Sequence, residues 1–140
     1  MISCTRRLEF DYGHRLLNHE GKCAHVHGHR GTLEITCSAD ALDVVGRVLD
    51  FGEVKRVVGG WVDEHFDHAF ISNPYDHAVL AFLRKEGSRL WVMPEECAEP
   101  SAENIAWVML GVARDLLRTS GVEVRAVRFY ETPNGWADAV

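Results

Sequence analysis

The chain has 140 residues, a formal net charge of −6 with histidine counted neutral, 46% hydrophobic residues and four cysteines. This length suits one ordinary domain with a buried core, so we expect a single domain over residues 1–140. The acidic balance and the absence of a Lys- or Arg-rich block exclude nucleic-acid binding through a basic patch. Scattered cysteines, a polar N-terminus and no apolar run of membrane length indicate a cytoplasmic protein that does not bind membranes.

The first predicted element is a half-buried strand, because Leu8, Phe10 and Tyr12 alternate with charged residues. His14 continues the apolar parity, so its side chain is expected on the buried face. A histidine there needs a partner, which is either a carbonyl that accepts its ring N–H or a metal ion. The strand by itself leaves both interpretations open.

A short histidine-rich segment then concentrates the candidate chemistry. In a strand His27 and His29 point to one face and could chelate one metal ion, although two such histidines can also be simply solvated or hydrogen-bonded. The next predicted strand, 32–37, has its apolar residues on the same parity. If it pairs with the first strand, His14 joins the pair, and three imidazoles with an open position are typical of catalytic zinc. Cys23 lies just upstream, where cationic charge would favour its thiolate as a base or a nucleophile.

A helix is predicted next, with Asp50 as its N-cap and an apolar stripe from Phe51 to His65. The Gly59–Gly60 pair inside it indicates a break or close packing. Directly after this helix, Asp67 could orient the ring of His68 and stabilise its charged form, as in a proton relay. Adjacent Asp and His residues also occur by chance, and this chain contains a second such pair.

The second half of the chain predicts a short helix over 76–86, a short strand over 90–93, a helix from a Ser101 N-cap to Gly121 and a strand over 122–132. In that last strand the inward parity changes between Val124 and Val127, which predicts a β-bulge. The change places Glu131 on the apolar face, where a carboxylate is either salt-bridged or bound to a ligand with donor groups. The order of the elements predicts an α+β domain without repeats.

Several motifs in this order resemble the 6-pyruvoyl tetrahydropterin synthase family, and within it the bacterial 6-carboxy-5,6,7,8-tetrahydropterin synthases of the queuosine pathway. They span nearly the whole chain, at Phe10–Leu16, Cys23–His29, Leu49–Phe51, Phe66–His68, Pro100–Asn104 and Glu131–Pro133. The resemblance implies that the zinc ligands are His14, His27 and His29. It implies a catalytic base and a proton-relay pair, namely Cys23 with Asp67 and His68. It also implies that the substrate is bound by Glu131, which would anchor the pterin, and by Ser101 and Glu103.

The resemblance further implies a reaction and an assembly. The reaction is the zinc-dependent conversion of 7,8-dihydroneopterin triphosphate to 6-carboxy-5,6,7,8-tetrahydropterin with release of triphosphate and acetaldehyde, which makes the protein a lyase. The implied fold is the tunnelling fold (T-fold), an antiparallel four-stranded sheet with two main helices on one face. Several copies form a barrel, commonly a homohexamer built as a dimer of trimers with sites between subunits. Two departures from the family concern the details of substrate contacts: His25 stands where relatives usually have another residue, and Ser101–Ala102 replaces a Thr-rich pair.

Four alternatives remain open at this stage. A sibling enzyme would keep all three side-chain carbons and make pyruvoyl tetrahydropterin, and another would yield a folate precursor, a branch expected to carry Glu in place of Cys23. The run Gly21, His27, His29 and Glu34 imitates the first metal motif of a cupin, but two strong helices and no second such motif argue against that barrel. The last alternative is a zinc-stabilised module that binds a pterin or purine without turnover.

Overall fold

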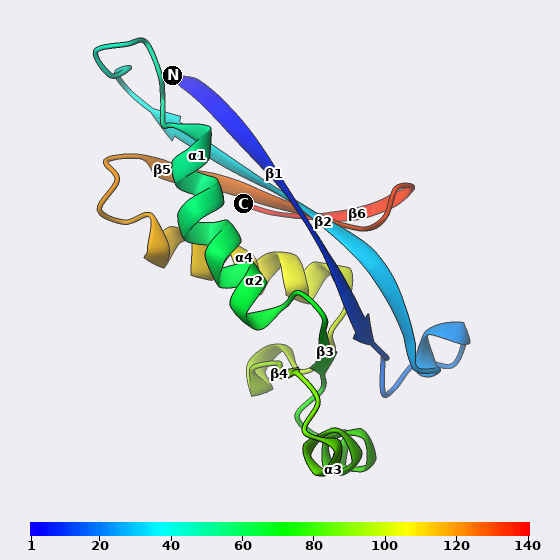
Figure 1. Ribbon diagram of the computed structural model, residues 1–140. Helices are drawn as coiled ribbons and strands as arrows, with labels where there is room; N and C mark the ends of the chain where they lie inside the picture. The colour runs from blue at the N-terminus through cyan, green and yellow to red at the C-terminus, as the bar shows by residue number, and fades with distance from the viewer.

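A computed structural model describes all 140 residues as one six-stranded mixed sheet with helices. The strands lie in the order β4-β3-β1-β2-β5-β6, and Figure 1 shows the long strands β1 and β2 crossing the molecule side by side. The strands are β1 (Ile2–His14), β2 (His27–Ala39), β3 (Ala69–Ser72), β4 (Leu90–Val92), β5 (Glu123–Thr132) and β6 (Gly135–Ala139). The helices are η1 (Lys22–Ala24), α1 (Phe51–Val54), η2 (Lys55–Gly59), α2 (Gly60–His65), α3 (His77–Glu86), η3 (Glu95–Cys97) and α4 (Ala102–Leu116).

The centre of the fold is the antiparallel pair β1 and β2. Their register runs without interruption from Ile2 opposite Ala39 to His14 opposite His27. Side chains of one parity are buried on both strands, including Phe10 and Leu33, while their neighbours in sequence face outward. The predicted alternation is therefore confirmed, and it sets which side chains share the buried face.

The predicted bulge in β5 is confirmed. Thr36 pairs with Ala126 but Cys37 pairs with Val124, so one extra residue is inserted in β5 at this point. Val124 and Val127 are both buried in consequence, although their sequence parities differ. A second irregularity in the pairing of β5 with β6 lies between Tyr130 and Thr132, directly around Glu131.

The two long predicted helices form on the buried face of the sheet. Asp50 caps the first one by accepting from the Gly52 amide at 2.7 Å, and the helix continues to His65 through a π-helical stretch, η2, rather than breaking. A Cβ atom at Gly59 would lie 3.4 Å from Cδ2 of Leu8, at van der Waals contact. The helix therefore packs against β1 at this glycine rather than breaking there. Ser101 caps α4 by accepting from the Asn104 amide, and α4 contributes buried residues to the same core as β1, β2 and β5.

The expected four-stranded antiparallel sheet is wrong in two respects. β3 pairs in parallel with β1 at Tyr12–His14, and β4 pairs in parallel with β3, so the sheet is mixed and has six strands. The segments that form β3 and β4 have four and three residues, which is too short to show a strand period in sequence. The expected strand at 90–93 and the short helix with its left-handed Gly87 cap are present.

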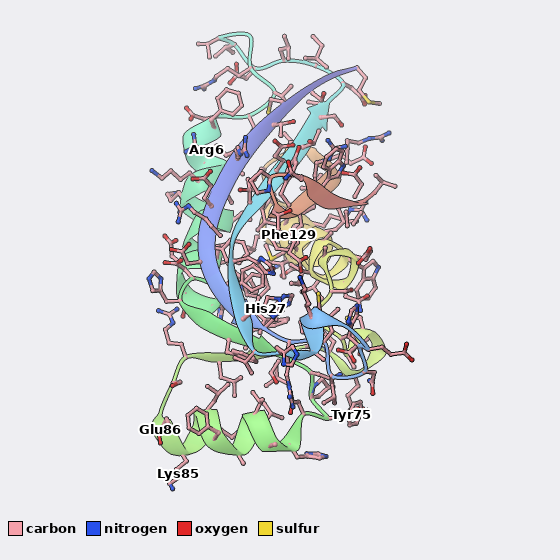
Figure 2. All side chains as sticks on the ribbon, turned by 90° about the vertical axis from the view of Figure 1, so that its right-hand side faces the viewer. Arg6, His27, Tyr75, Lys85, Glu86 and Phe129 are labelled. Carbon is pink, nitrogen blue, oxygen red and sulfur yellow. The ribbon has the colours of Figure 1, made fainter.

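Figure 2 shows α3 at one end of the molecule, with Lys85 and Glu86 at its outer tip. Only Leu80 of this helix is buried. No helix is both long and apolar enough to cross a membrane.

Candidate active site

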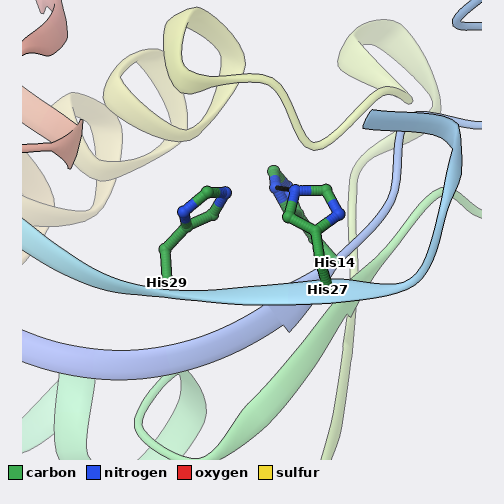
Figure 3. A group of neighbouring side chains, drawn as sticks. All are labelled: His14, His27 and His29. Carbon is green, nitrogen blue, oxygen red and sulfur yellow. Dashed lines mark hydrogen bonds between the residues drawn. The ribbon is translucent and has the colours of Figure 1, made fainter. Parts of the chain in front are cut away.

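Three histidines meet at the end of the β1–β2 ribbon. The register places His14 opposite His27 and Tyr12 opposite His29, so the three imidazoles project from one face of two adjacent strands. Their ring centroids lie 4.6, 4.8 and 5.2 Å apart, and one nitrogen from each ring lies within 4.8 Å of the others. Figure 3 shows the rings turned toward a common centre. The predicted convergence of the three side chains is therefore present in the fold.

Main-chain carbonyls orient two of the rings. The Nδ1 atom of His14 lies 2.8 Å from the Pro100 carbonyl oxygen, and that of His27 lies 2.6 Å from the His25 carbonyl oxygen. Each Nδ1 donates to its carbonyl, so each Nε2 presents a lone pair, and these two Nε2 atoms are 3.1 Å apart. The Nε2 atom of His29 is buried without any hydrogen-bond partner. Such an orphaned atom beside two oriented lone pairs fits a metal ion with three imidazole ligands.

Burial disfavours protonation of two of these rings, those of His14 and His29. Burial lowers the pKa of His14 to about 4, and the neighbouring His27 and His29 oppose its protonation further, although the Pro100 carbonyl acts in the other direction. Burial also lowers the pKa of His29, against the attraction of Glu131. Metal ligation requires neutral imidazoles, so the lowered pKa values of His14 and His29 favour it.

Glu131 borders this centre from β5. Its Oε1 atom lies 3.4 Å from Nε2 of His14 and 3.8 Å from Nε2 of His29. The pairing irregularity at this point of β5 accompanies the placement of a half-buried carboxylate beside three imidazoles. Glu131 also lines a neighbouring cavity, so its carboxylate is accessible both to a metal ligand sphere and to a bound molecule.

That cavity has a volume of about 270 Å³ and gathers residues from four chain segments. Its lining includes Cys23 from η1, Ser101 and Glu103 from the start of α4, and Glu131. Cys23 is a free, half-buried thiol. The fold thus brings together four of the residues that the sequence singles out for catalysis and substrate binding.

Asp67 and His68 lie elsewhere. The Asp67 Oδ2 atom is 3.0 Å from Nδ1 of His68, and Asp67 Oδ1 accepts from the Asp11 amide at 3.0 Å. Burial would raise the pKa of Asp67, but the hydrogen bonds from the Asp11 amide and the His68 ring outweigh it and lower the pKa. The His68 side chain is 71% exposed and its φ of 59° is in the left-handed region, which is uncommon for a non-glycine residue. It lines a different cavity, of about 400 Å³, with Asp11, so within one chain this pair does not face Cys23.

Sequence reasoning missed three contributors to the site. The Pro100 carbonyl orients His14 but carries no sequence signal, because any residue has a carbonyl. Asp11 joins the Asp67–His68 cluster through an amide and a carboxylate, and its exposed parity gave no hint of this. The Tyr12 hydroxyl is buried without a partner, and burial together with Glu131 raises the Tyr12 pKa far above its usual range. Of these three contributors, only Tyr12 could have been predicted from the sequence, because it has the same strand parity as His14.

The chain is similar to known proteins over nearly its whole length. A family model described as 6-pyruvoyl tetrahydropterin synthase matches residues 3–140. The chain is 40% identical over 136 residues to a 6-carboxy-5,6,7,8-tetrahydropterin synthase of Rickettsia bellii, covering 96% of both, and 27% identical over 144 residues to the enzyme of that name from Haemophilus influenzae, covering 99% and 98%.

Solved structures extend the similarity to the fold. An uncharacterized protein from Wolinella succinogenes has 26% identity and a TM-score of 0.81, with 99% of this chain and 97% of that chain covered. The 6-pyruvoyl tetrahydropterin synthase of Caenorhabditis elegans has 19% identity and a TM-score of 0.71, with 99% and 94% covered, which shows a common fold.

Proposed function

The chain belongs to the 6-pyruvoyl tetrahydropterin synthase family, and from that premise we propose that it is a zinc-dependent 6-carboxy-5,6,7,8-tetrahydropterin synthase. It would convert 7,8-dihydroneopterin triphosphate with release of triphosphate and acetaldehyde. The observation that carries the proposal is the cluster of three imidazoles beside a cavity lined by Cys23 and Glu131. A pterin-binding lyase needs those groups side by side.

The metal would be held by His14, His27 and His29. The orphaned Nε2 of His29 and the two carbonyl-oriented rings support this ligand set. Three protein ligands leave a position for substrate, as in catalytic rather than structural zinc sites. When bound, zinc would polarise side-chain hydroxyls of the substrate and make the neighbouring C–H and O–H protons more acidic.

The cavity residues would bind the substrate and remove a proton. A pterin offers a ring N–H and an amino group side by side, which the carboxylate of Glu131 can accept in bidentate fashion. Ser101 and Glu103 line the same cavity from the start of α4 and would complete the contacts to the ring. Cys23, across the cavity, would act as the base in its thiolate form.

We assign the second proton-transfer group to Asp67 and His68 of a neighbouring copy of the chain. These residues do not line the Cys23 cavity of their own chain, and His68 is exposed. β3 pairs with β1 only at Tyr12–His14, and Asp11 is bound to Asp67 and His68, which leaves the side of β1 from Ile2 to Phe10 without a strand partner. β4 and β6 are the outer strands of the sheet. Free edges of this length favour pairing between copies. We therefore propose that residues 1–140 form a single T-fold domain that assembles as a homohexamer, a dimer of trimers, with sites between subunits.

Incubation with 7,8-dihydroneopterin triphosphate, followed by mass analysis of the product, tests the proposed activity. The carboxy product with acetaldehyde is expected. A pyruvoyl product without acetaldehyde would identify the sibling activity instead. Cys23→Ala is expected to retain zinc and lose turnover, whereas equal ligand binding by both proteins with no turnover by either would identify a binding module.

The assembly has its own test. If sites form between copies, Cys23→Ala and His68→Ala are each inactive, but mixed oligomers of the two variants regain activity because some sites combine two intact groups. Mixing by denaturation and refolding, with activity measured per oligomer, decides this. Absence of any regain in mixed oligomers of wild-type size would contradict the shared site.

A further inference from the structure

Glu99 lies outside the cavity but holds the segment that carries Cys23. It is a half-buried residue between η3 and α4. Its Oε2 atom accepts from the Leu17 amide at 2.9 Å. Its Oε1 atom accepts from the Asn18 amide at 2.9 Å and from the Asn18 side-chain nitrogen at 2.8 Å. One carboxylate thus binds three donors of a loop more than 80 residues away in sequence.

This contact is the anchor of the whole segment 16–24. Apart from the bond of the adjacent His25 amide to the Lys22 carbonyl, the other hydrogen bonds of that segment are internal, and one of them joins the Leu16 amide to the Cys23 carbonyl at 2.8 Å. Leu16 and Cys23 line the same cavity. The position of the Cys23 thiol therefore depends on a loop whose only hydrogen bonds to residues distant in sequence are those to Glu99.

The main chain beside Glu99 is fixed to the opposite wall of the cavity. The Glu99 carbonyl accepts from the side-chain nitrogen of Asn104 at 2.9 Å. The next carbonyl, that of Pro100, accepts from Nδ1 of His14 at 2.8 Å, and Ser101 caps α4 through the Asn104 amide. Glu99 and the residue after it therefore contact three parts of the site: the loop that carries Cys23, the ring of His14 and the start of α4 at Ser101.

We propose that Glu99 is a positioning residue that sets where the Cys23 thiol lies relative to the imidazole cluster and the substrate cavity. An ionised carboxylate suits this role because it only accepts hydrogen bonds and has sites for all three donors. A glutamine has nearly the same shape, but its NH2 group would face either the Leu17 amide or the two donors of Asn18. The proposal rests on the proposed function only for what Cys23 does, since the hydrogen bonds exist without substrate.

The test compares Glu99→Gln and Glu99→Ala with the matched pair Glu96→Gln and Glu96→Ala in the zinc-loaded protein. Glu96 is exposed, lies in η3 three residues away and makes no side-chain hydrogen bond. Four quantities are measured: zinc content, amide hydrogen exchange at Leu17 and Asn18, the rate of Cys23 alkylation by iodoacetamide, and kcat and KM. Cys4, alkylated in the same molecule, serves as the internal reference for the alkylation rate.

For the Glu99 variants we expect zinc content and melting temperature near those of wild type. Amide hydrogen exchange at Leu17 and Asn18 should be about tenfold faster than in wild type, or more. We expect the alkylation rate of Cys23 to change and that of Cys4 to stay the same. Because misplacement of a reacting group by about 1 Å can cost about a hundredfold in rate, kcat should fall between about tenfold and a hundredfold, with a smaller change in KM. The milder glutamine variant keeps the test available if the alanine variant unfolds.

Two outcomes would overturn the proposal. One is wild-type amide exchange and Cys23 alkylation in both Glu99 variants. The other is a loss of activity that only follows a loss of zinc, which would make Glu99 a structural support of the metal centre. If the wild-type protein does not turn over the pterin triphosphate, the proposed function fails, while exchange and alkylation still decide the role of Glu99.

Discussion

The ion pair of Arg15 with Asp76 should be a major stabilising contact, and variants of both residues can measure it. Arg15 directly follows His14 in sequence, and Asp76 precedes α3. The guanidinium binds the carboxylate in bidentate fashion, with Nε to Oδ2 at 2.6 Å and Nη2 to Oδ1 at 2.7 Å. The Asp76 side chain is 2% exposed and that of Arg15 is 26% exposed. Asp76 also caps α3 by accepting from the Val79 amide at 3.3 Å.

The expected magnitude follows from this geometry. Removing one partner of a buried pair leaves an uncompensated charge and costs about 3–5 kcal/mol. Arg15 keeps some water contact, so Arg15→Gln should lower the free energy of unfolding by about 3 kcal/mol, near the lower bound. Asp76→Asn retains an oxygen that can cap α3, while Asp76→Ala loses the cap as well, which should cost about 1 kcal/mol more. The double variant Arg15→Gln/Asp76→Asn should be destabilised by less than the sum of its singles.

The same pair predicts an acid dependence. Hydrogen bonds from Arg15 lower the pKa of Asp76, and they outweigh the opposing effect of burial. The unfolded chain, in which Asp has its usual pKa of about 3.9, therefore binds a proton more readily than the folded one. The contribution of Asp76 is present above about pH 4 and is lost as the pH falls through the folded-state pKa.

Urea unfolding followed by circular dichroism at pH 7 and at several values below pH 4 checks both expectations. Asp76→Asn should show a weaker loss of stability in acid than wild type. Arg47→Gln is the control, because Arg47 pairs only with carboxylates on the surface, those of Asp43 and Asp50, and this variant should unfold nearly like wild type. Strict additivity of the singles, or an unchanged acid dependence in Asp76→Asn, would refute the reasoning.

Three further outcomes are expected. Tyr12→Phe removes a buried hydroxyl without a partner and should raise the free energy of unfolding by about 1 kcal/mol, measured by urea titration; a decrease would show that the hydroxyl has a partner. Gly31→Ala would place a side-chain carbon 2.8 Å from the Phe129 ring and should lower the free energy of unfolding by about 2 kcal/mol. Gly111→Ala would place its carbon with nothing within 4 Å and should stabilise α4 by up to about 1 kcal/mol. After metal removal by a chelator, the free energy of unfolding should fall as the pH drops from 6.5 toward 4. The folded state holds the His14 pKa at about 4, so unfolding takes up a proton in that range. A free energy of unfolding from urea titration that does not change over this range would contradict the prediction.

The sequence predicted the histidine cluster because a strand has a fixed side-chain period. Parity assigned His14 to the buried face of β1, and the pairing of β1 with β2 then required His27 and His29 to lie beside it. The bulge in β5 was visible for the same reason, as a phase change between Val124 and Val127. A pattern of period two predicts the strand register well, because a register shift by one residue would expose the entire apolar face.

The elements that were missed or mistaken lack such a period. β3 has only four residues and is too short to alternate, and its parallel pairing with β1 depends on how the chain packs after α2 rather than on local residues. β4 was predicted as a short strand over 90–93, but its parallel pairing with β3 was not. β6 was not predicted at all, because Gly135–Ala139 carries little apolar alternation. The different cavities lined by His68 and Cys23 were not predicted either, because strand and helix periods do not show how separate segments of the chain lie relative to each other.

The orientation of the site is set mainly by main-chain atoms, and this limits what sequence can show. The carbonyls of Pro100 and His25 orient two imidazoles, and the Asp11 amide fixes Asp67. Glu99 reverses the roles, because its side chain is the acceptor and main-chain amides are the principal donors. It stands in an acidic stretch that reads as a solvated loop, so nothing in its neighbours indicates those donors. Residue identity therefore indicates which chemistry the chain can perform, while the geometry that permits it comes from backbone groups that every residue possesses.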